Sequence, residues 1–499
     1  MKRRGLLSSA ILLGLASALL AIVLYRMIHY MRVAKVYDAP CKSVDFMMAV
    51  VCLSAIGVLL YRLCGVKVIH GLLLVGGCCF LAVPSYFSPT DECCHFAYIE
   101  HLVSRHRLPT VRDPMSNTVF SLEEHIYPRP SVRDQSKRGL AGYIYQAVHP
   151  PLYYLGAAGV CVVTPGDWVN KIYLLRGVGL LALMTSVLII IRSYRSVVLH
   201  KAVPEDRFLF YSILCVFTLT PGILFRMTTI SNLHLALPLC LLFYHQLFRQ
   251  ECFGAEMTAR RVALLGVLTG CILTTHFFNI TLVVVGVFFL LFRGGKRLAP
   301  LYLACSGAVV LPWLIFNYSQ YGSLTGWKSI VPMMLDAVNP TKAQYDLSRV
   351  LQQLDPKFFH MFWNPEEAKQ SWFLSDMIGK YLSGLMVVAV LAGLVHQVRR
   401  LAAKDFSQRL DLLCLLGIGL NFGLLVYISI SESVPAVLGR FLYFSLWPLI
   451  FLTYRFLIAI PVFERRCFAL SLMVSAAMLW TNFFVMIARD RLIPLPSSS

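Results

Sequence analysis

The chain has 499 residues, of which 58% are hydrophobic and only 14% are charged, and its mean hydropathy is +0.69. A soluble protein of this size could not cover its surface with so few charged side chains, so we predict an all-α polytopic membrane protein. The net charge of +20 does not indicate nucleic-acid binding, because much of the basic charge falls in short segments between apolar stretches.

The apolar stretches predict about thirteen membrane-spanning helices. The first follows Met1-Lys2-Arg3-Arg4 and is too long for a signal peptide, and no small-residue cleavage site comes after it, so we predict a retained span. The predicted spans are residues 5–27, 45–63, 68–87, 171–193, 207–224, 232–248, 261–276, 278–293, 298–316, 376–397, 411–430, 437–457 and 466–487.

Basic residues in the connectors predict the orientation of these spans. With a cytoplasmic N-terminus, alternation through the spans places the main basic connectors on the cytoplasmic side. These connectors contain Arg192 and Arg195, Arg260 and Arg261, Arg293 to Arg297, Arg399 and Arg400, and Arg465 and Arg466. Segments 88–170, 318–375 and 431–439 then lie on the opposite side. They hold a disproportionate share of the acidic, His and Trp residues, so we expect the chemistry there.

The segment from His149 to Val163 is apolar, but counting it as a span would invert every later loop. We therefore predict a helix in the membrane interface, with its tyrosines at headgroup depth. The predicted regions are the N-terminal spans (1–87), a first non-cytoplasmic loop with interfacial helices and the catalytic motif (88–170), a central transmembrane bundle (171–317), a second non-cytoplasmic loop (318–375) and a C-terminal transmembrane bundle (376–499).

The run from Pro89 to Phe96 carries two adjacent carboxylates directly after a predicted span. Ionisable groups at a lipid–water boundary indicate a functional site. Asp91 could accept a proton from a sugar or lipid hydroxyl, and on a helix it shares a face with His95. The alternative is a helix N-cap, because Thr90 followed by acidic residues is also good capping sequence.

Further candidates stand elsewhere on the predicted non-cytoplasmic side. His149 precedes a Pro-Pro pair and is a candidate anion or phosphate contact, with an interfacial histidine as the alternative. Arg440, between a glycine and a phenylalanine at the mouth of a span, is a second candidate phosphate contact. For Arg176, which lies a few residues into a span, a structural ion pair is an equal alternative. Asn317 is a polar candidate in a stretch that also fits an interfacial aromatic belt.

Several catalytic motifs are absent from the sequence. It has no Walker A loop, HExxH, GxSxG or Rossmann fingerprint, so nucleotide-driven chemistry and zinc hydrolysis are unsupported. The 15 cysteines are scattered without zinc spacing. We predict no dedicated metal site, and a divalent metal, Mg²⁺ or Mn²⁺, stays open as a cofactor.

Four short motifs follow one another along roughly residues 85–460. They are Asp91-Glu92 with His95 and Leu108-Pro109, then Pro150 to Tyr154 with Arg176, then Trp313 with Phe316-Asn317-Tyr318 and Tyr321-Gly322, and last Gly439 to Leu442. In this order they resemble the integral-membrane glycosyltransferases of the GT-C class, especially the branch of protein O-mannosyltransferases and lipid A aminoarabinose transferases. The chain departs from that pattern at Ser231 to His234 and Thr274 to His276, and two spans rather than one precede the motif-bearing span.

The resemblance implies a GT-C-like fold and an enzyme that moves a sugar from a polyprenyl-phosphate donor to an acceptor protein, lipid or glycan, with inversion. Asp91 is then similar to the catalytic base, with Glu92 beside it as a second catalytic candidate. The implied donor phosphate contacts are Arg440, His149 and Arg176. The implied substrate contacts are His95, Tyr153, Asn317 and Tyr321.

This reading places a multi-pass protein in the bilayer with its active site on the non-cytoplasmic side. A bacterial inner or plasma membrane is favoured, with the endoplasmic reticulum as the alternative. A transporter or flippase of a lipid-linked or amphipathic substrate is the competing hypothesis, although it would place its polar groups near the bilayer midplane. A third hypothesis is a scaffold subunit, which predicts that neutralising Asp91 changes neither activity nor lipid binding.

Overall fold

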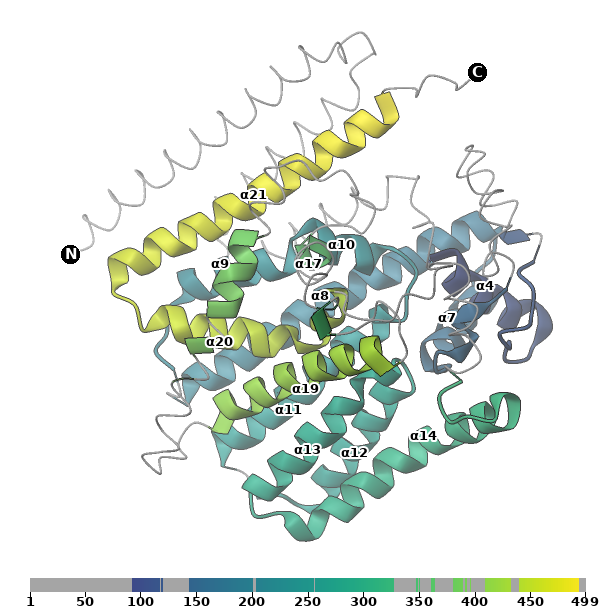
Figure 1. Ribbon diagram of the computed structural model, residues 1–499, viewed down its shortest axis with the longest axis horizontal. Helices are drawn as coiled ribbons and strands as arrows, with labels where there is room; N and C mark the ends of the chain where they lie inside the picture. Colours follow the sequence, from purple (N-terminus) through teal and green to yellow (C-terminus); the bar gives the residue numbers. More distant parts are fainter. Residues whose placement is uncertain are drawn as a thin grey trace.

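The computed structural model (Figure 1) describes residues 92–116, 118–119, 143–200, 203–254, 256–326, 347–348, 350, 360–363, 380–388, 391–392, 395, 409–431 and 439–492. The described part is helical, and its β-type pairing is an isolated antiparallel bridge between Pro114 and Tyr143. The predicted spans 5–27, 45–63 and 68–87 lie outside the described residues, as does part of 376–397.

The described helices occur close to the remaining predicted spans. In chain order, with η marking 3-10 helices, they are α4 (Glu92–Arg105), η2 (Tyr145–Val148), α7 (Leu152–Val163), α8 (Trp168–Leu199), α9 (Arg207–Thr218), α10 (Pro221–Thr228), α11 (Leu233–Phe253), α12 (Ala259–Leu273), η3 (Phe277–Ile280), α13 (Thr281–Phe292), η4 (Lys296–Leu298), α14 (Ala299–Tyr321), α17 (His360–Trp363), α19 (Arg409–Ser431), η6 (Gly439–Ser445), α20 (Leu446–Ile458) and α21 (Val462–Leu492).

Four of the described helices are long and apolar enough to cross a membrane. They are Asn170–Leu199, Lys296–Tyr321, Arg409–Ser431 and Phe441–Ile458. A fifth candidate results if α9 and α10, which are bent by 55° at their junction, form one broken span. Leu181, Ile315 and Tyr427 on these helices are more than half exposed, as expected for side chains that face lipid. The helices are therefore compatible with a membrane protein, and the full number of thirteen spans stays a prediction.

Local sequence explains where several helices begin and end. The carboxylates of Asp167 and Asp206 accept backbone N–H groups in the first turns of α8 and α9. Pro221 opens α10 and cannot continue α9, which explains the bend between them. The short helix α7 has 12 residues, fewer than the roughly 20 that a spanning helix needs. Its place in the membrane interface stays a prediction.

Glycines allow the long helices to pack closely. Gly266 and Gly270 lie one turn apart on the face of α12 that meets α14, and a Cβ atom on Gly266 would stand 2.6 Å from the carbonyl oxygen of Tyr302. A Cβ atom on Gly270 would stand 2.6 Å from Cβ of Val309. This is the small-xxx-small spacing that brings membrane helices into backbone contact. Figure 1 shows α12, α13 and α14 running alongside one another.

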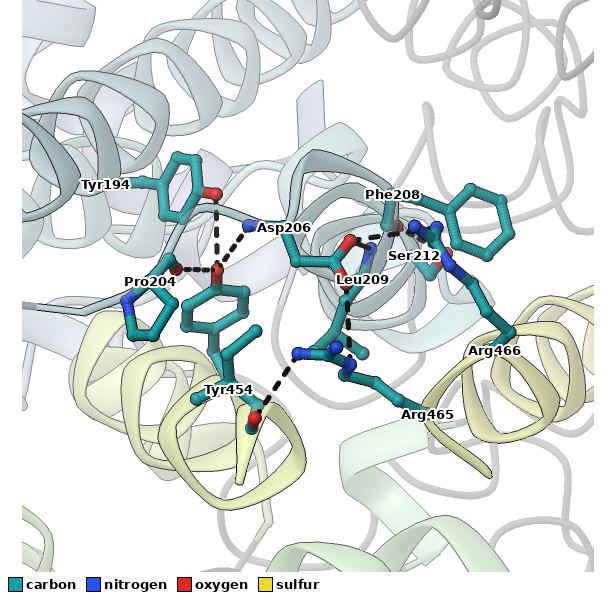
Figure 2. A network of polar contacts seen from close by, with 10 residues as sticks. Tyr194, Pro204, Asp206, Phe208, Leu209, Ser212, Tyr454, Arg465 and Arg466 are labelled. Carbon is teal, nitrogen blue, oxygen red and sulfur yellow. Dashed lines mark hydrogen bonds and ion pairs between the residues drawn. The ribbon is translucent and has the colours of Figure 1, made fainter. Parts of the chain in front are cut away.

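Acidic side chains paired with arginines gather at one end of the bundle. Asp206, before α9, lies 3.5 Å from Arg465 and 3.7 Å from Arg466 of α21 (Figure 2). The other pairs at this end are Glu251 with Arg293 and Arg409, and Asp411 with Arg455. All five of these arginines belong to or border the connectors that the sequence assigns to the cytoplasm. The grouping agrees with the predicted alternation, while the identity of that side stays a prediction.

Candidate functional site

A buried ion pair fixes the start of α4. The Glu92 and Arg176 side chains are 1% and 4% exposed, and Nε and Nη2 of Arg176 donate to the two Glu92 oxygens over 2.9 and 2.8 Å. Glu92 Oε1 also accepts the backbone N–H of Ile230 over 2.8 Å. The carboxylate therefore joins α4, α8 and the segment that precedes α11.

This geometry favours the ion-pair alternative for Arg176. Removing a buried carboxylate from three donors to take up a proton would leave an uncompensated guanidinium, so we regard Glu92 and Arg176 as positioning residues. The catalytic role of Glu92 and the phosphate contact of Arg176 stay predictions. Asp91, the predicted base, directly precedes α4 in the sequence and lies outside the described residues.

Three histidines form a row beside this pair. His95 lies one turn after Glu92 on α4, His149 directly follows η2, and His276 directly precedes η3. The ring centroids of His95 and His149 are 6.2 Å apart, and those of His149 and His276 are 5.7 Å apart. Nδ1 of His95 is 2.7 Å from the hydroxyl of Tyr154, so this ring is held in place from α7. We call His95, His149 and His276 the histidine row.

The two tyrosines that follow the Pro-Pro pair face the protein interior. Tyr154 is fully buried and stacks on Tyr98, with ring centroids 3.8 Å apart. The Tyr153 hydroxyl is 3.4 Å from Nδ1 of His234, at the start of α11. Burial raises the pKa of Tyr153, and the Glu92 charge raises it further, so its phenol stays protonated and available as a donor. Tyr153 is thus a core residue beside the site, and its contact with substrate stays a prediction.

Backbone contacts hold the turn that carries His276. The N–H of Leu152 donates to the carbonyl oxygen of Thr274 over 3.0 Å. The side-chain amide of Asn232 donates to the backbone carbonyl oxygen of Thr275 over 3.3 Å. Both stretches that depart from the family pattern, 231–234 and 274–276, therefore meet at the site. The sequence had not singled out His234 or His276 as site residues. The available signal was that each of the two stretches that depart from the family pattern contains a histidine.

A small cavity opens next to the histidine row. Its interior volume is about 10 Å³, roughly the room that one water molecule needs. The lining consists of Val148, His149, Pro150, His276, Phe277, Phe278, Trp313, Asn317, Leu324 and Thr325. Asn317 is therefore brought to His149 from the far end of α14. Tyr321 is not a lining residue; its hydroxyl accepts the N–H of Val111 over 3.2 Å, and its contact with substrate stays a prediction.

The last motif reaches the site through η6. The ring of Phe441 lies 5.7 Å from that of His276 and 5.2 Å from that of Phe278, measured between centroids. Asn421 of α19 anchors the segment by donating to the carbonyl oxygen of Phe441 over 3.0 Å. Arg440 precedes Phe441 in η6, but its side chain lies outside what the structure describes, so its phosphate contact stays a prediction.

The described part of the site supplies hydrogen-bond donors and acceptors. Its one described carboxylate is neutralised by Arg176, and imidazole and amide groups supply the remaining polar atoms. Among the described residues, no group of three or more His, Cys, Asp or Glu side chains is placed to hold a metal ion. Mg²⁺ or Mn²⁺ stays open as a cofactor.

Comparison of the chain with protein-family models, with curated proteins and with solved structures found no match.

Proposed function

We propose that the chain is an integral-membrane glycosyltransferase that moves a sugar from a polyprenyl-phosphate donor to an acceptor hydroxyl on the non-cytoplasmic face. The observation that carries this proposal is the meeting of all four sequence motifs at one end of the helical bundle. His95, Pro150, Asn317 and Phe441 each belong to one of the four motifs, and all of them line or border the histidine row and its cavity.

The proposed reaction is a single displacement at the anomeric carbon. Asp91 accepts the proton of the acceptor hydroxyl while the hydroxyl oxygen forms a bond to that carbon. The bond between the anomeric carbon and the phosphate oxygen breaks, and the polyprenyl phosphate leaves with the electron pair. Arg440 and His149 donate hydrogen bonds to the leaving phosphate, whose charge develops in the transition state. One displacement inverts the anomeric configuration, and no covalent enzyme intermediate forms.

The ion pair of Glu92 and Arg176 has a positioning role in this proposal. Asp91 is the next residue to Glu92, so a carboxylate held by three hydrogen bonds limits where the base can stand. Arg440 is given the phosphate role because it precedes Phe441 in η6, whose ring lies beside that of His276. We propose a bacterial inner or plasma membrane as the location, with the endoplasmic reticulum as the alternative.

The position of the polar groups favours an enzyme over a transporter or flippase. His234 lies in the first turn of α11 and Glu251 in its last, and 17 residues of helix separate them by roughly 25 Å. The histidine row lies at the His234 end. A transporter of the inverted-repeat type would concentrate such groups near the middle of its helices.

Transfer from radiolabelled polyprenyl-phosphate sugars tests the proposal. Membranes that contain the wild type would be compared with membranes that contain Asp91→Asn, using a panel of hexosyl and pentosyl donors and endogenous acceptors. Asp167→Asn is a matched control because asparagine caps a helix about as well as aspartate, so α8 keeps its N-cap. We expect transfer by the wild type and by the control and none above background by Asp91→Asn, with donor binding retained by all three.

Each other result has a definite meaning. Full transfer by Asp91→Asn would reject Asp91 as the base. If the wild type transfers no sugar from any donor while it binds the lipid, the enzyme proposal fails. Wild-type vesicles that then move a fluorescent polyprenyl phosphate between leaflets would establish the transporter alternative.

A further inference from the structure

Four basic residues from two separate connectors lie at the end of the bundle opposite the histidine row. Arg260 and Arg261 belong to the first turn of α12, and Lys296 and Arg297 form the start of η4, which continues into α14. His276 follows the other end of α12, so the length of that helix separates these residues from the histidine row. We call Arg260, Arg261, Lys296 and Arg297 the basic rim.

The packing of α12 against α14 sets the two halves of the basic rim at the same height. A Cβ atom on Gly266 of α12 would stand 2.6 Å from the carbonyl oxygen of Tyr302 in α14. A Cβ atom on Gly270, one turn later, would stand 2.9 Å from the carbonyl oxygen of Ser306. The two helices therefore run parallel with a constant offset along the chain. Followed back toward the start of both helices, the same offset places the Arg-Arg pair of α12 level with the Lys-Arg pair of η4.

The charges of the basic rim have little compensation within the described part of the chain. All four residues are exposed, and none of them forms an ion pair with another described residue. The nearby carboxylate of Glu251 is engaged by Arg293 and Arg409. Glu256, whose carbonyl oxygen accepts from Arg261 over 2.8 Å, adds one exposed carboxylate in the connector before α12. Four positive charges at one height repel one another, so the basic rim favours an anionic ligand.

An apolar surface begins one turn inside the basic rim. Leu264 of α12, one turn after Arg260, is 60% exposed. Leu303, Leu311 and Ile315 lie along one side of α14 and are 46%, 53% and 60% exposed. They extend over about 18 Å of helix, which is comparable to the length of a fatty acyl chain in one leaflet. The same end of the bundle thus offers cations to an anionic headgroup and an exposed apolar face to the chains attached to it.

We propose that the basic rim binds an anionic glycerophospholipid, with the lipid phosphate at the four cations and the acyl chains along the exposed side of α14. Arginine side chains donate paired hydrogen bonds to phosphate oxygens, and Lys296 adds a point charge. A zwitterionic lipid carries an ammonium group beside its phosphate, which the basic rim repels, so the anionic lipid is preferred. The lipid site lies at the opposite end of α12 from the proposed transfer centre and does not depend on sugar transfer.

Native mass spectrometry of the full chain in neutral detergent tests the proposal. The probes are phosphatidylglycerol and phosphatidylcholine with identical acyl chains, and the readout is the dissociation constant of the first bound lipid. We expect the wild type to bind phosphatidylglycerol about tenfold or more tightly than phosphatidylcholine. The double variant R260Q/R297Q should lose most of this preference. The charge-matched control R192Q/R195Q, which changes an exposed pair near the end of α8, should retain it.

Three results would overturn the proposal. The first is equal affinity of the wild type for the two lipids, and the second is the same loss of preference in both double variants, which would show an effect of overall charge. The third is displacement of the lipid by inorganic phosphate or glycerol 3-phosphate at equal concentration, which would indicate a site for a soluble phosphate. If R260Q/R297Q fails to fold, K296Q/R297Q takes its place, with the same expected loss and the same control.

Discussion

Glu92 and Arg176, 84 positions apart, form a two-point ion pair that is almost completely buried, with both contacts shorter than 3 Å. A pair of this kind holds its geometry because either charge alone in the interior would be strongly unfavourable. It connects the start of α4, where the first motif lies, to α8, and the Ile230 N–H adds the segment before α11. The candidate site is therefore assembled around this contact.

Removing one member of the pair should destabilise the protein strongly. We expect Glu92→Gln and Arg176→Met each to cost about 3–5 kcal/mol, because each leaves the other group buried without its partner. The double variant should lose less than the sum of the two, which a double-mutant cycle of unfolding free energies in detergent would measure. The exposed pair of Glu205 and Arg207 is the control, and its matching substitutions should cause no measurable change. Additive losses at Glu92 and Arg176 would contradict the coupling.

Two glycines in α8 should respond oppositely to the same substitution. A Cβ atom on Gly179 would overlap the carbonyl oxygen of Met227 and the ring of His234, whereas one on Gly177 would meet nothing within 4 Å. Gly179→Ala should therefore cost about 1–3 kcal/mol by overpacking and displace His234 from Tyr153. Gly177→Ala should be neutral or stabilising by up to about 1 kcal/mol, since alanine is the better helix former. Thermal unfolding of the two variants makes the comparison, and equal melting temperatures would refute it.

Asp206 both pairs with two arginines and caps the start of α9. Substitutions of Asp206 and of the arginines should separate these two contributions to stability. Figure 2 shows its carboxylate between Arg465 and Arg466, with one oxygen also accepting the N–H of Leu209. Asp206→Asn keeps an acceptor for that N–H, whereas Asp206→Ala does not. We therefore expect Asp206→Ala to be about 1 kcal/mol less stable than Asp206→Asn. Arg465→Met should destabilise more than Arg466→Met, because the side chains are 13% and 41% exposed. Denaturant unfolding would measure all four variants, and the reverse order of the two arginines would contradict this account.

The turn from Thr110 to Asp113 should weaken in acid. Burial alone would raise the pKa of Asp113, but hydrogen bonds from Arg107 and from Thr110 outweigh it and lower that pKa. The carboxylate therefore contributes stability that is complete above the unfolded-state pKa of about 3.9 and is lost as the pH falls through the lower folded-state value. Asp113→Asn should lack this contribution at every pH.

Hydrogen exchange of the turn amides, corrected for the intrinsic rate at each pH, would show the difference. The wild type should be better protected than Asp113→Asn above about pH 4, and the two should converge below it. Protection of the Val111 N–H is the most direct readout, because that group lies in the turn and donates to the Tyr321 hydroxyl. Identical protection of the two proteins at neutral pH would contradict the prediction.

Much of the helix pattern could be predicted from the sequence. Apolar runs such as 171–193 and 411–430 correspond to α8 and α19. A helix that crosses lipid must satisfy its backbone hydrogen bonds internally and be apolar over about 20 residues, so its length and hydropathy can be recognised in the sequence. The segment after Pro150 and Pro151 forms a helix too short to span, as its effect on the loop alternation had indicated. Local cues were sufficient here, since each concerns neighbours in the chain.

The side-chain partners could not be predicted in the same way. The sequence left Arg176 open between a phosphate contact and an ion pair, and it did not single out His234 or His276. Those assignments depend on which helix faces lie together, and Arg176 meets Glu92 only when the tertiary fold brings α8 to the start of α4. Tyr153 shows the same limit, because an aromatic side chain in a short apolar helix suits a headgroup layer and a protein core equally.

The sequence by itself determined a helical membrane-type chain, the positions of its apolar helices and the motifs that the site would contain. The tertiary structure alone decided that His95, His149 and His276 form one row, that Glu92 is held by Arg176, and that Asn317 reaches the cavity beside His149. The physical reason is one of range. Hydropathy and helix ends arise from residues within a few turns of one another, whereas a site arises from contacts between helices that are distant in the chain.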